Sequence, residues 1–243
     1  MSSVAFWNRV HSQGPAHWEY GVELPKDDDP VLHAALAHFG DVTGKRLIDL
    51  GCGSGAASLF FAARGAEVIA VDTSDQAVLN LQRYCAAGGI ENVHPMTADA
   101  FRLTDVGPAD LAYGSMILHH LEPFPKFVDV LRETIVPNGR GFFYENSSVS
   151  RLLIWFRTHL VGRWWIPKNG DDEEFPLAPQ EIDVLRKQFA VRTAYPELLF
   201  FRLISMYLLR GKYPKPFATL DRWGYRIPWL RKLSYRQYVY LSS

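Results

Sequence analysis

Cysteine is scarce in this 243-residue sequence, and neither sign of charge is in excess. Cys52 and Cys85 are the only cysteines. They are too few for a disulfide framework and lack the spacing of metal ligands, so we expect no metal site. Lysine and arginine together number 26, as do aspartate and glutamate. Because this balance lacks the basic excess of nucleic-acid-binding proteins, no nucleic-acid partner is expected.

Long apolar runs are also missing. No stretch approaches the ~20 consecutive apolar residues of a membrane-spanning helix, and the N-terminus has no apolar core of a secretion signal. We therefore expect a cytoplasmic protein. A content of 48% apolar and 21% charged residues is ordinary for a globular domain. The length suffices for one large domain with a substantial core.

Short apolar runs alternate with amphipathic stretches over residues 45–145. Runs such as 45–50 and 66–71 show no polar alternation, which is typical of strands buried on both faces of a parallel sheet. Further strands are expected over 92–98 and 109–115, and 136–145 is expected to be a turn that leads into another strand. Helices are expected over 55–64, 74–87 and 123–135, with Gly88 ending the second helix. This alternation predicts an α/β fold with a doubly wound, mostly parallel sheet.

The pattern is looser after residue 146. Helices are expected over 150–165, 179–189 and 198–210, a loop over 166–180, and strands near 190–197 and 236–242. We expect one domain in three parts: an N-terminal leader (1–44), a ligand-binding core (45–146), and a C-terminal part (147–243) that completes the sheet and adds helical insertions.

The stretch LIDLGCGSGA (47–56) places three glycines between a strand and a helix. Such a turn presents backbone N–H groups to a ligand at the carboxyl edge of the sheet. A phosphate-binding loop needs Lys and Ser or Thr after its last glycine, whereas Gly55 precedes two alanines. Gly51, Gly53 and Ala56 do satisfy the dinucleotide pattern, with Asp72 about 20 residues on. Asp49, however, is a poor neighbour for a pyrophosphate.

The order of the motifs along residues 45–145 resembles class I SAM-dependent methyltransferases (SAM, S-adenosylmethionine), in particular the type-11-like small-molecule branch. The resembling segments are LIDLGCGSG (47–55), VIAVDTS (68–74), TADAF (97–101), DLAYGSMILHHL (110–121) and LRETIVPNGRGFFYE (131–145), in which Asn138 replaces the first of two glycines. The resemblance implies a Rossmann-like sheet of seven strands, SAM as cofactor, and a small or medium-sized acceptor molecule as substrate.

The resemblance also implies which residues hold SAM. Asp72 would bind the ribose hydroxyls and Asp99 the adenine amino group, while Asp49 would suit the ammonium and sulfonium charges. Cys52 is interpreted as a small spacer in the turn rather than a nucleophile. The full set of expected cofactor-binding residues is Asp49, Gly51, Cys52, Gly53, Asp72, Thr73, Asp99, Ala100 and Ser115.

His119 and His120 follow the fourth expected strand, and Glu145 ends the fifth. Histidine titrates near neutrality and suits removal of a proton from a hydroxyl acceptor. We therefore expect O-methylation, with one imidazole facing the pocket and His120 favoured over His119. Glu145 is a second candidate base or a substrate anchor. The alternatives are N- or C-methylation, a nicotinamide-dependent oxidoreductase, a non-catalytic SAM-binding protein, and a purely structural role for the His pair.

Aromatic residues gather at both ends of the chain. The leader carries Trp7, His11, Trp18 and Tyr20, which we interpret as pocket residues on a lid over the cofactor. The segments 150–165 and 198–231 mix aromatic residues with arginine and lysine. We expect them to form an apolar cap over the acceptor, in preference to a contact with a membrane surface. The sequence does not indicate the oligomeric state.

Overall fold

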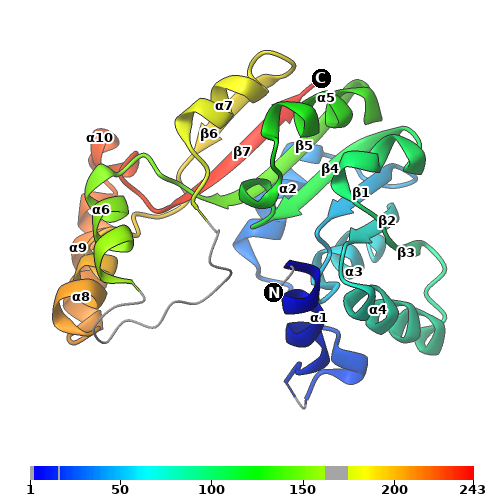
Figure 1. Cartoon of the computed structure of the whole chain (residues 1–243), viewed down its shortest axis with the longest axis horizontal. Coiled ribbons are helices and arrows are strands. Elements are labelled where there is room, and N and C mark those ends of the chain that lie inside the picture. The colour runs from blue at the N-terminus through cyan, green and yellow to red at the C-terminus, as the bar shows by residue number, and fades with distance from the viewer. Residues whose placement is uncertain (1–2, 16, 162–174) are drawn as a thin grey trace.

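The computed structural model describes residues 3–15, 17–161 and 175–243, which form a seven-stranded sheet flanked by helices (Figure 1). The strand order is β3-β2-β1-β4-β5-β7-β6, and only β7 runs antiparallel to its neighbours. The doubly wound, mostly parallel sheet of the sequence analysis is thereby confirmed. The strands are β1 (Arg46–Leu50), β2 (Glu67–Asp72), β3 (Val93–Thr97), β4 (Ala109–Ser115), β5 (Ile135–Asn146), β6 (Ala190–Ala194) and β7 (Arg236–Ser242).

Most helices follow the predicted ranges. The α-helices are α1 (Ser3–Ser12), α2 (Pro30–Phe39), α3 (Ala56–Ala62), α4 (Asp75–Gly88), α5 (Phe124–Thr134), α6 (Arg151–Leu160), α7 (Pro179–Leu185), α8 (Phe201–Leu209), α9 (Pro214–Gly224) and α10 (Pro228–Arg231). Short 3-10 turns cover Glu19–Gly21, Ala100–Val106 and Leu118–His120. Of the predicted helix 150–165 and loop 166–180, residues 162–174 lie outside the described residues.

Two apolar layers explain why the central strands lack polar alternation. Leu47 packs with the residues of α2, α3 and α4 on one face of the sheet, and the next residue, Ile48, packs with those of α5 and α7 on the other. Val68 and Ile69 divide in the same way. Successive side chains of a strand point to opposite faces, so both faces are covered.

One turn residue differs from the sequence expectation. The last helical residue of α4 is Gly88, and the left-handed cap is Gly89, with φ of 62°. Asn138 has φ of 65°, a conformation that asparagine tolerates better than most residues. A Cβ at the neighbouring Gly139 would approach the Asp110 carbonyl oxygen to 2.8 Å. The irregular first part of β5 thus has a glycine where a side chain would not fit and an asparagine where φ is positive.

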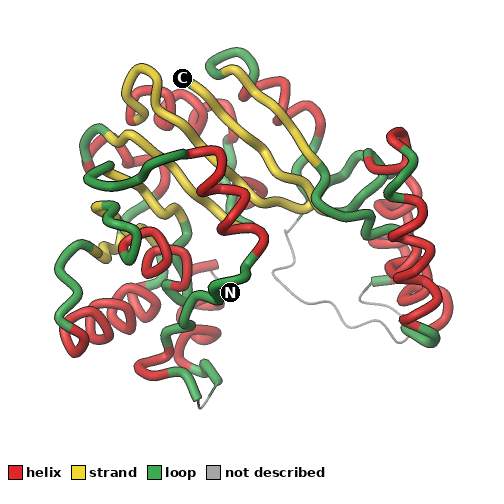
Figure 2. The backbone as a smooth tube through the Cα atoms, turned by 180° about the vertical axis from the view of Figure 1, so that it is seen from behind, coloured by secondary structure: helices red, strands yellow, loops and turns green. Residues whose placement is uncertain are grey.

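Helices α6, α8, α9 and α10 stand apart from the sheet, to the left in Figure 1 and to the right in the reverse view of Figure 2. We call residues 150–161 and 198–235 the C-terminal lobe. It has an apolar cluster of its own, which includes Leu153, Leu203 and Tyr207. Among the described residues, no helix is long and apolar enough to cross a membrane.

The strand order reverses between β1 and β4, because β2 and β3 lie on one side of β1 while β5 lies beyond β4. Open α/β sheets bind ligands outside the carboxyl ends of the strands at such a reversal. The glycine turn follows β1, and the segment containing His119 and His120 follows β4. The candidate residues therefore meet at this edge.

Candidate active site

The glycine turn after β1 forms the floor of the site. Gly51 and Gly55 have φ of 69° and 84°, a region that side chains with a Cβ disfavour. A Cβ on Gly51 would also come within 3.0 Å of the Ile117 side chain, and one on Gly55 within 2.6 Å of Leu81. The backbone amides of Gly51 and Cys52 donate to the Val71 carbonyl at 2.8 and 3.0 Å. The turn is therefore held against β2.

A cavity of about 390 Å³ lies over this turn. It is bounded by residues from the ends of β1, β2 and β4, from the turn after β3, and from the leader helix α1. The residues expected at the site that line it are Trp7, His11, Gly51, Gly53, Asp72, Thr73, Asp99, Ala100, Ser115 and His120.

Asp72 and Asp99 are each fixed by backbone amides at the cavity wall. Asp72 accepts hydrogen bonds from the amide of Gly53 at 2.9 Å and from that of Ser74 at 2.8 Å. Asp99 accepts from the Phe101 amide at 2.9 Å and caps the following 3-10 turn. Both carboxylates keep oxygen lone pairs for a further donor. The apolar part of the cavity wall includes Phe101, Ile117 and Leu121.

A second cavity of about 310 Å³ adjoins the first and shares Gly51, Gly53 and Ser115 with it. Asp49 lines it, is 1% exposed, and accepts a hydrogen bond from the Ser58 hydroxyl at 2.6 Å. Burial raises the pKa of Asp49 to about 7, with a further contribution from the nearby Asp72. A cation placed beside Asp49 would favour its ionised form.

Cys52 also lines the second cavity. It is 7% exposed, and burial raises the pKa of its thiol above the ordinary value. Because the thiolate is the reactive form of cysteine, this environment suits the spacer interpretation better than a nucleophile.

Two acids of the second cavity were not anticipated from the sequence. Glu23 lines it and accepts a hydrogen bond from the Ser54 hydroxyl at 3.3 Å, and Asp29 lines it while capping helix α2. Both lie in the leader, outside every recognised motif. The available signal was the cluster of acids in ELPKDDDP (23–30).

The two adjacent histidines point in different directions. His120 lines the main cavity, with its ring centroid 6.1 Å from that of Trp7. The side chain of His119 is 4% exposed, and its Nδ1 lies 2.7 Å from Oε2 of Glu145. Since an ionised carboxylate only accepts hydrogen bonds, this Nδ1 carries the proton. The two imidazole rings lie 4.2 Å apart.

Glu145 does not face the cavity, contrary to the expectation of a pocket-facing acid. It is fully buried, and its Oε1 accepts the amides of Ile117 and Leu118 at 2.8 and 2.7 Å. Together with His119 these donors satisfy the carboxylate. Glu145 points inward because the chain that leaves β4 turns sharply over β5. The backbone amides of this turn, those of Ile117 and Leu118, need a buried acceptor. Glu145 therefore fixes the segment that carries His120.

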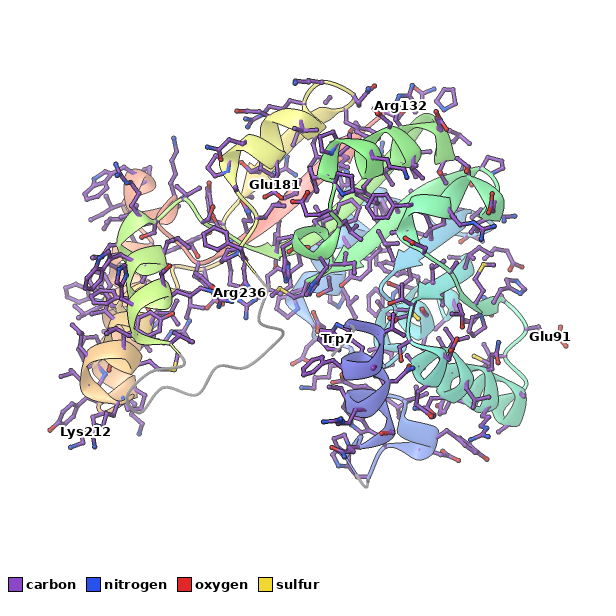
Figure 3. All side chains as sticks on the ribbon, in the orientation of Figure 1. Trp7, Glu91, Arg132, Glu181, Lys212 and Arg236 are labelled. Carbon is purple, nitrogen blue, oxygen red and sulfur yellow. The ribbon has the colours of Figure 1, made fainter. Side chains whose placement is uncertain are left out.

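The leader contributes half of its expected residues to the main cavity. Trp7 and His11 line it, and Figure 3 shows Trp7 on helix α1 beside the sheet edge. Burial lowers the pKa of His11, although Asp72 opposes this shift. Trp18 and Tyr20 lie instead on a separate depression against helix α4. They are displaced because the chain turns back over α4 after Ser12.

The chemistry of the two cavities favours a cationic ligand. Among the described residues that line either cavity there is no lysine or arginine. The carboxylates of Asp72, Asp99 and Asp49 face the two spaces from the sheet side. A pyrophosphate would meet these negative charges without a cationic partner, whereas a ligand with a diol and positive groups would be complementary.

Comparisons with known proteins agree with this chemistry. A family described as a methyltransferase domain matches residues 47–139. The ubiquinone biosynthesis O-methyltransferase of Idiomarina loihiensis is 30% identical over 181 residues, covering 72% of this chain and 73% of that protein. The enzyme of the same name from Rickettsia felis is 25% identical over 183 residues, covering 73% and 71%. A SAM-dependent methyltransferase from Aquifex aeolicus has a similar fold, with a TM-score of 0.56 at 15% identity and coverage of 100% and 99%.

The chain belongs to the class I SAM-dependent methyltransferase family. SAM is therefore the cofactor of this methyltransferase, as the resemblance implied. The nicotinamide alternative is set aside, since its pyrophosphate would find no basic residue among the described lining.

Proposed function

We propose that this methyltransferase transfers the methyl group of SAM to a hydroxyl oxygen of a small acceptor, with His120 as general base. The observation that carries the proposal is the position of His120 on the wall of the cavity that also contains Asp72 and Thr73. The relatives named above are O-methyltransferases by name, which supports an oxygen acceptor.

In this proposal the two connected cavities divide the cofactor between them. Asp72 holds the ribose diol, Asp99 accepts from the adenine amino group, and Asp49 faces the ammonium group in the smaller cavity. Bound SAM supplies an electrophilic methyl group on its sulfonium. The remaining contacts come from backbone or small side chains, namely Gly51, Cys52, Gly53, Thr73, Ala100 and Ser115.

The protein's own part in the chemistry is positioning and proton removal. His120 would accept the hydroxyl proton as the oxygen attacks, so that a neutral ether product forms. Glu145 and His119 act as positioning residues, because they clamp the turn that presents His120. Trp7 from the leader would close one side of the acceptor space and exclude water.

The acceptor we propose is a small, mainly apolar ring that carries the hydroxyl. The cavity that His120 lines is also lined by Val4, Trp7, Met116 and Leu121, an apolar set that suits a flat apolar molecule. We further propose that the protein acts in the cytoplasm, since both cysteines are unpaired thiols.

A direct test is methyl transfer from labelled SAM to a panel of catechols, simple phenols and matched arylamines. We expect methylation of hydroxyl compounds and little of the amines. His120→Ala should lower turnover by about 10²–10⁴ with little change in SAM affinity, whereas His119→Ala should act mainly through stability. Preferred methylation of the amines, with turnover retained in His120→Ala, would refute the proposal.

A further inference from the structure

The C-terminal lobe is strongly basic although the whole chain is neutral. It holds ten of the 26 lysines and arginines but only one of the 26 acids, Asp221. Its formal charge is therefore +9, and the remainder of the chain carries the balancing −9. The neutral total charge of the chain hides this separation of positive from negative residues. Neither cofactor binding at the glycine turn nor the proposed catalysis requires the separation.

The single acid of the lobe is turned inward. Asp221 is 3% exposed and accepts hydrogen bonds from the backbone amides of Phe200, Phe201 and Arg202, as well as from Nε of Arg202. It fixes the start of α8 and, because it is buried, adds no exposed negative charge to the described surface of the lobe. The exposed basic side chains are Arg151, Arg210, Lys212, Lys215, Arg222, Arg226 and Lys232.

The same lobe exposes large apolar side chains. Ten of the 17 exposed large apolar residues described in the chain lie on it: Leu152, Trp155, Met206, Leu208, Leu209, Tyr213, Leu220, Trp223, Ile227 and Trp229. The exposed fractions of Trp155, Trp223 and Trp229 are 52%, 68% and 66%. The lobe's own cluster already buries Phe156, Leu203 and Tyr207. The exposed residues are therefore surplus to the packing of the lobe.

Basic and apolar residues are interleaved on these helices. On α9, Leu220 and Trp223 are three residues apart and share one face, with the exposed Arg222 beside them. At the far end of the lobe, Leu209 and Tyr213 flank the exposed Lys212, which Figure 3 shows turned away from the sheet. Helices that lie in a membrane interface typically expose Trp, Tyr and Leu side chains among basic residues.

We propose that the C-terminal lobe docks the enzyme on an anionic lipid bilayer, lying in the interface without crossing it. A symmetric dimer through two copies of this lobe is disfavoured, because two surfaces of charge +9 repel each other. Nucleic acid accounts for the basic residues but not for exposed aliphatic side chains such as Leu208, Leu209 and Leu220. A bilayer accounts for both. This inference is independent of the acceptor and of the role of His120.

The test is sedimentation of the full-length protein with vesicles of phosphatidylcholine, either pure or with about 30 mol% phosphatidylglycerol. We expect binding to the anionic vesicles, weakened by high salt, and at least tenfold less binding to the neutral ones. Tryptophan emission should shift to the blue on binding, because Trp223 and Trp229 would leave water. Each basic side chain removed should lower partitioning about fivefold.

Lys215→Glu/Arg222→Glu and Trp223→Ser/Trp229→Ser should each lower partitioning at least tenfold. Lys187→Glu and Leu79→Ser are the controls, because both residues are exposed but lie outside the lobe, Lys187 after α7 and Leu79 on α4. Both controls should bind vesicles like the wild type. SAM-induced thermal stabilisation of every variant shows that it is folded.

The proposal is overturned if the folded wild type fails to bind anionic vesicles, or if the controls lose as much binding as the lobe variants. It is equally overturned if the wild type does not bind vesicles but binds single-stranded RNA or associates with itself, and the lobe variants lose that binding or association.

Discussion

At the scale of single residues, we expect Asp49 to couple cofactor binding to pH. Its pKa in the folded protein is about 7 because the carboxyl is buried, so near neutrality a substantial fraction carries a proton. A ligand cation beside it would favour the ionised form and release that proton. Cofactor affinity should therefore rise with pH up to about 7 through this group.

The variant Asp49→Asn keeps the shape of the side chain and removes its titration. We expect the wild type to gain SAM affinity between pH 5.5 and about 7, with proton release measurable by calorimetry in buffers of different ionisation enthalpy. The variant should lack this contribution. Equal pH dependence in both proteins would mean that the ammonium group does not approach Asp49.

The same residue affects stability with the opposite dependence. The unfolded Asp49 loses its proton near its ordinary value of 3.8, whereas the folded one keeps it until about pH 7. Between these values the unfolded chain binds fewer protons, so the free energy of unfolding from this group falls as pH rises. Denaturant unfolding of the apoprotein at pH 5 and 7 should show a smaller fall for Asp49→Asn than for the wild type.

Asp72 offers a separate test of the proposed ribose contact. Asp72→Ala would remove the proposed charge-assisted hydrogen bonds to the diol, together with the acceptor of the Gly53 amide, which should weaken SAM binding by about 1–3 kcal/mol. Titration calorimetry measures this loss, and Asp75→Ala, an exposed acid on the next helix, is the control. Unchanged affinity in Asp72→Ala would show that the β2 acid does not hold the ribose.

Single residues differed in how well the sequence predicted them. The acids near the carboxyl ends of β1 and β2 lie in motifs whose spacing places them at the sheet edge, so the positions of Asp49 and Asp72 could be predicted. The direction in which Glu145 points could not, because it depends on two amides of a different segment, those of Ile117 and Leu118.

At the scale of elements, the leader helix α1 is attached to the core through its polar side. Asn8 accepts hydrogen bonds from the Ser74 hydroxyl at 2.7 Å and the Gln76 amide at 3.3 Å, both at the start of α4. The His11 carbonyl accepts from Asn80 at 3.1 Å. These contacts hold Trp7 and His11 over the main cavity, and we propose that the leader serves as a lid.

Asn8→Ala should loosen this attachment and leave the core intact. Two hydrogen bonds of about 0.5–1.5 kcal/mol each are lost, so SAM affinity should fall by up to about 1–3 kcal/mol. Ser12→Ala, which removes only a bond to the Arg9 carbonyl within the leader, is the control. Wild-type SAM affinity in Asn8→Ala and in a variant lacking residues 1–12 would assign the leader to packing alone.

Helices and strands were predicted correctly where the apolar pattern was clear and capping residues indicated where the element begins and ends. Helix α4 has an N-cap at Ser74 and a glycine cap, and strands β1 and β2 are continuous apolar runs. Helices α1, α2, α9 and α10 were not predicted. Helix α2 is short and nearly apolar throughout, so it lacks the amphipathic pattern that identifies a helix from sequence. Helix α9 begins with Pro214 and Pro216, residues that usually indicate a turn or loop.

At the scale of the whole molecule, the chain combines an acidic remainder, which contains the catalytic core, with a basic lobe. The sheet could be predicted because parallel βαβ units allow few topologies. The separation of the lobe from the sheet could not, because an apolar stretch such as 198–210 fits either a cap on the core or a cluster of its own. Only the packing of Leu203 and Tyr207 against Phe156 and Leu153 decides between them.

Ligand binding to the folded state alone stabilises the whole molecule, and this gives the broadest test of the cofactor assignment. At a SAM concentration 100 times its dissociation constant the stabilisation is about 2.7 kcal/mol. For a chain of this size that raises the melting temperature by about 5–10 °C. The demethylated product should protect similarly, because it keeps the ribose, the adenine and the amino acid groups. Asp72→Ala should lose most of the shift at the same concentration, and NAD should produce none. Protection by NAD without protection by SAM would contradict the reading of both cavities, since it would require a pyrophosphate to bind where Asp49, Asp72 and Asp99 converge.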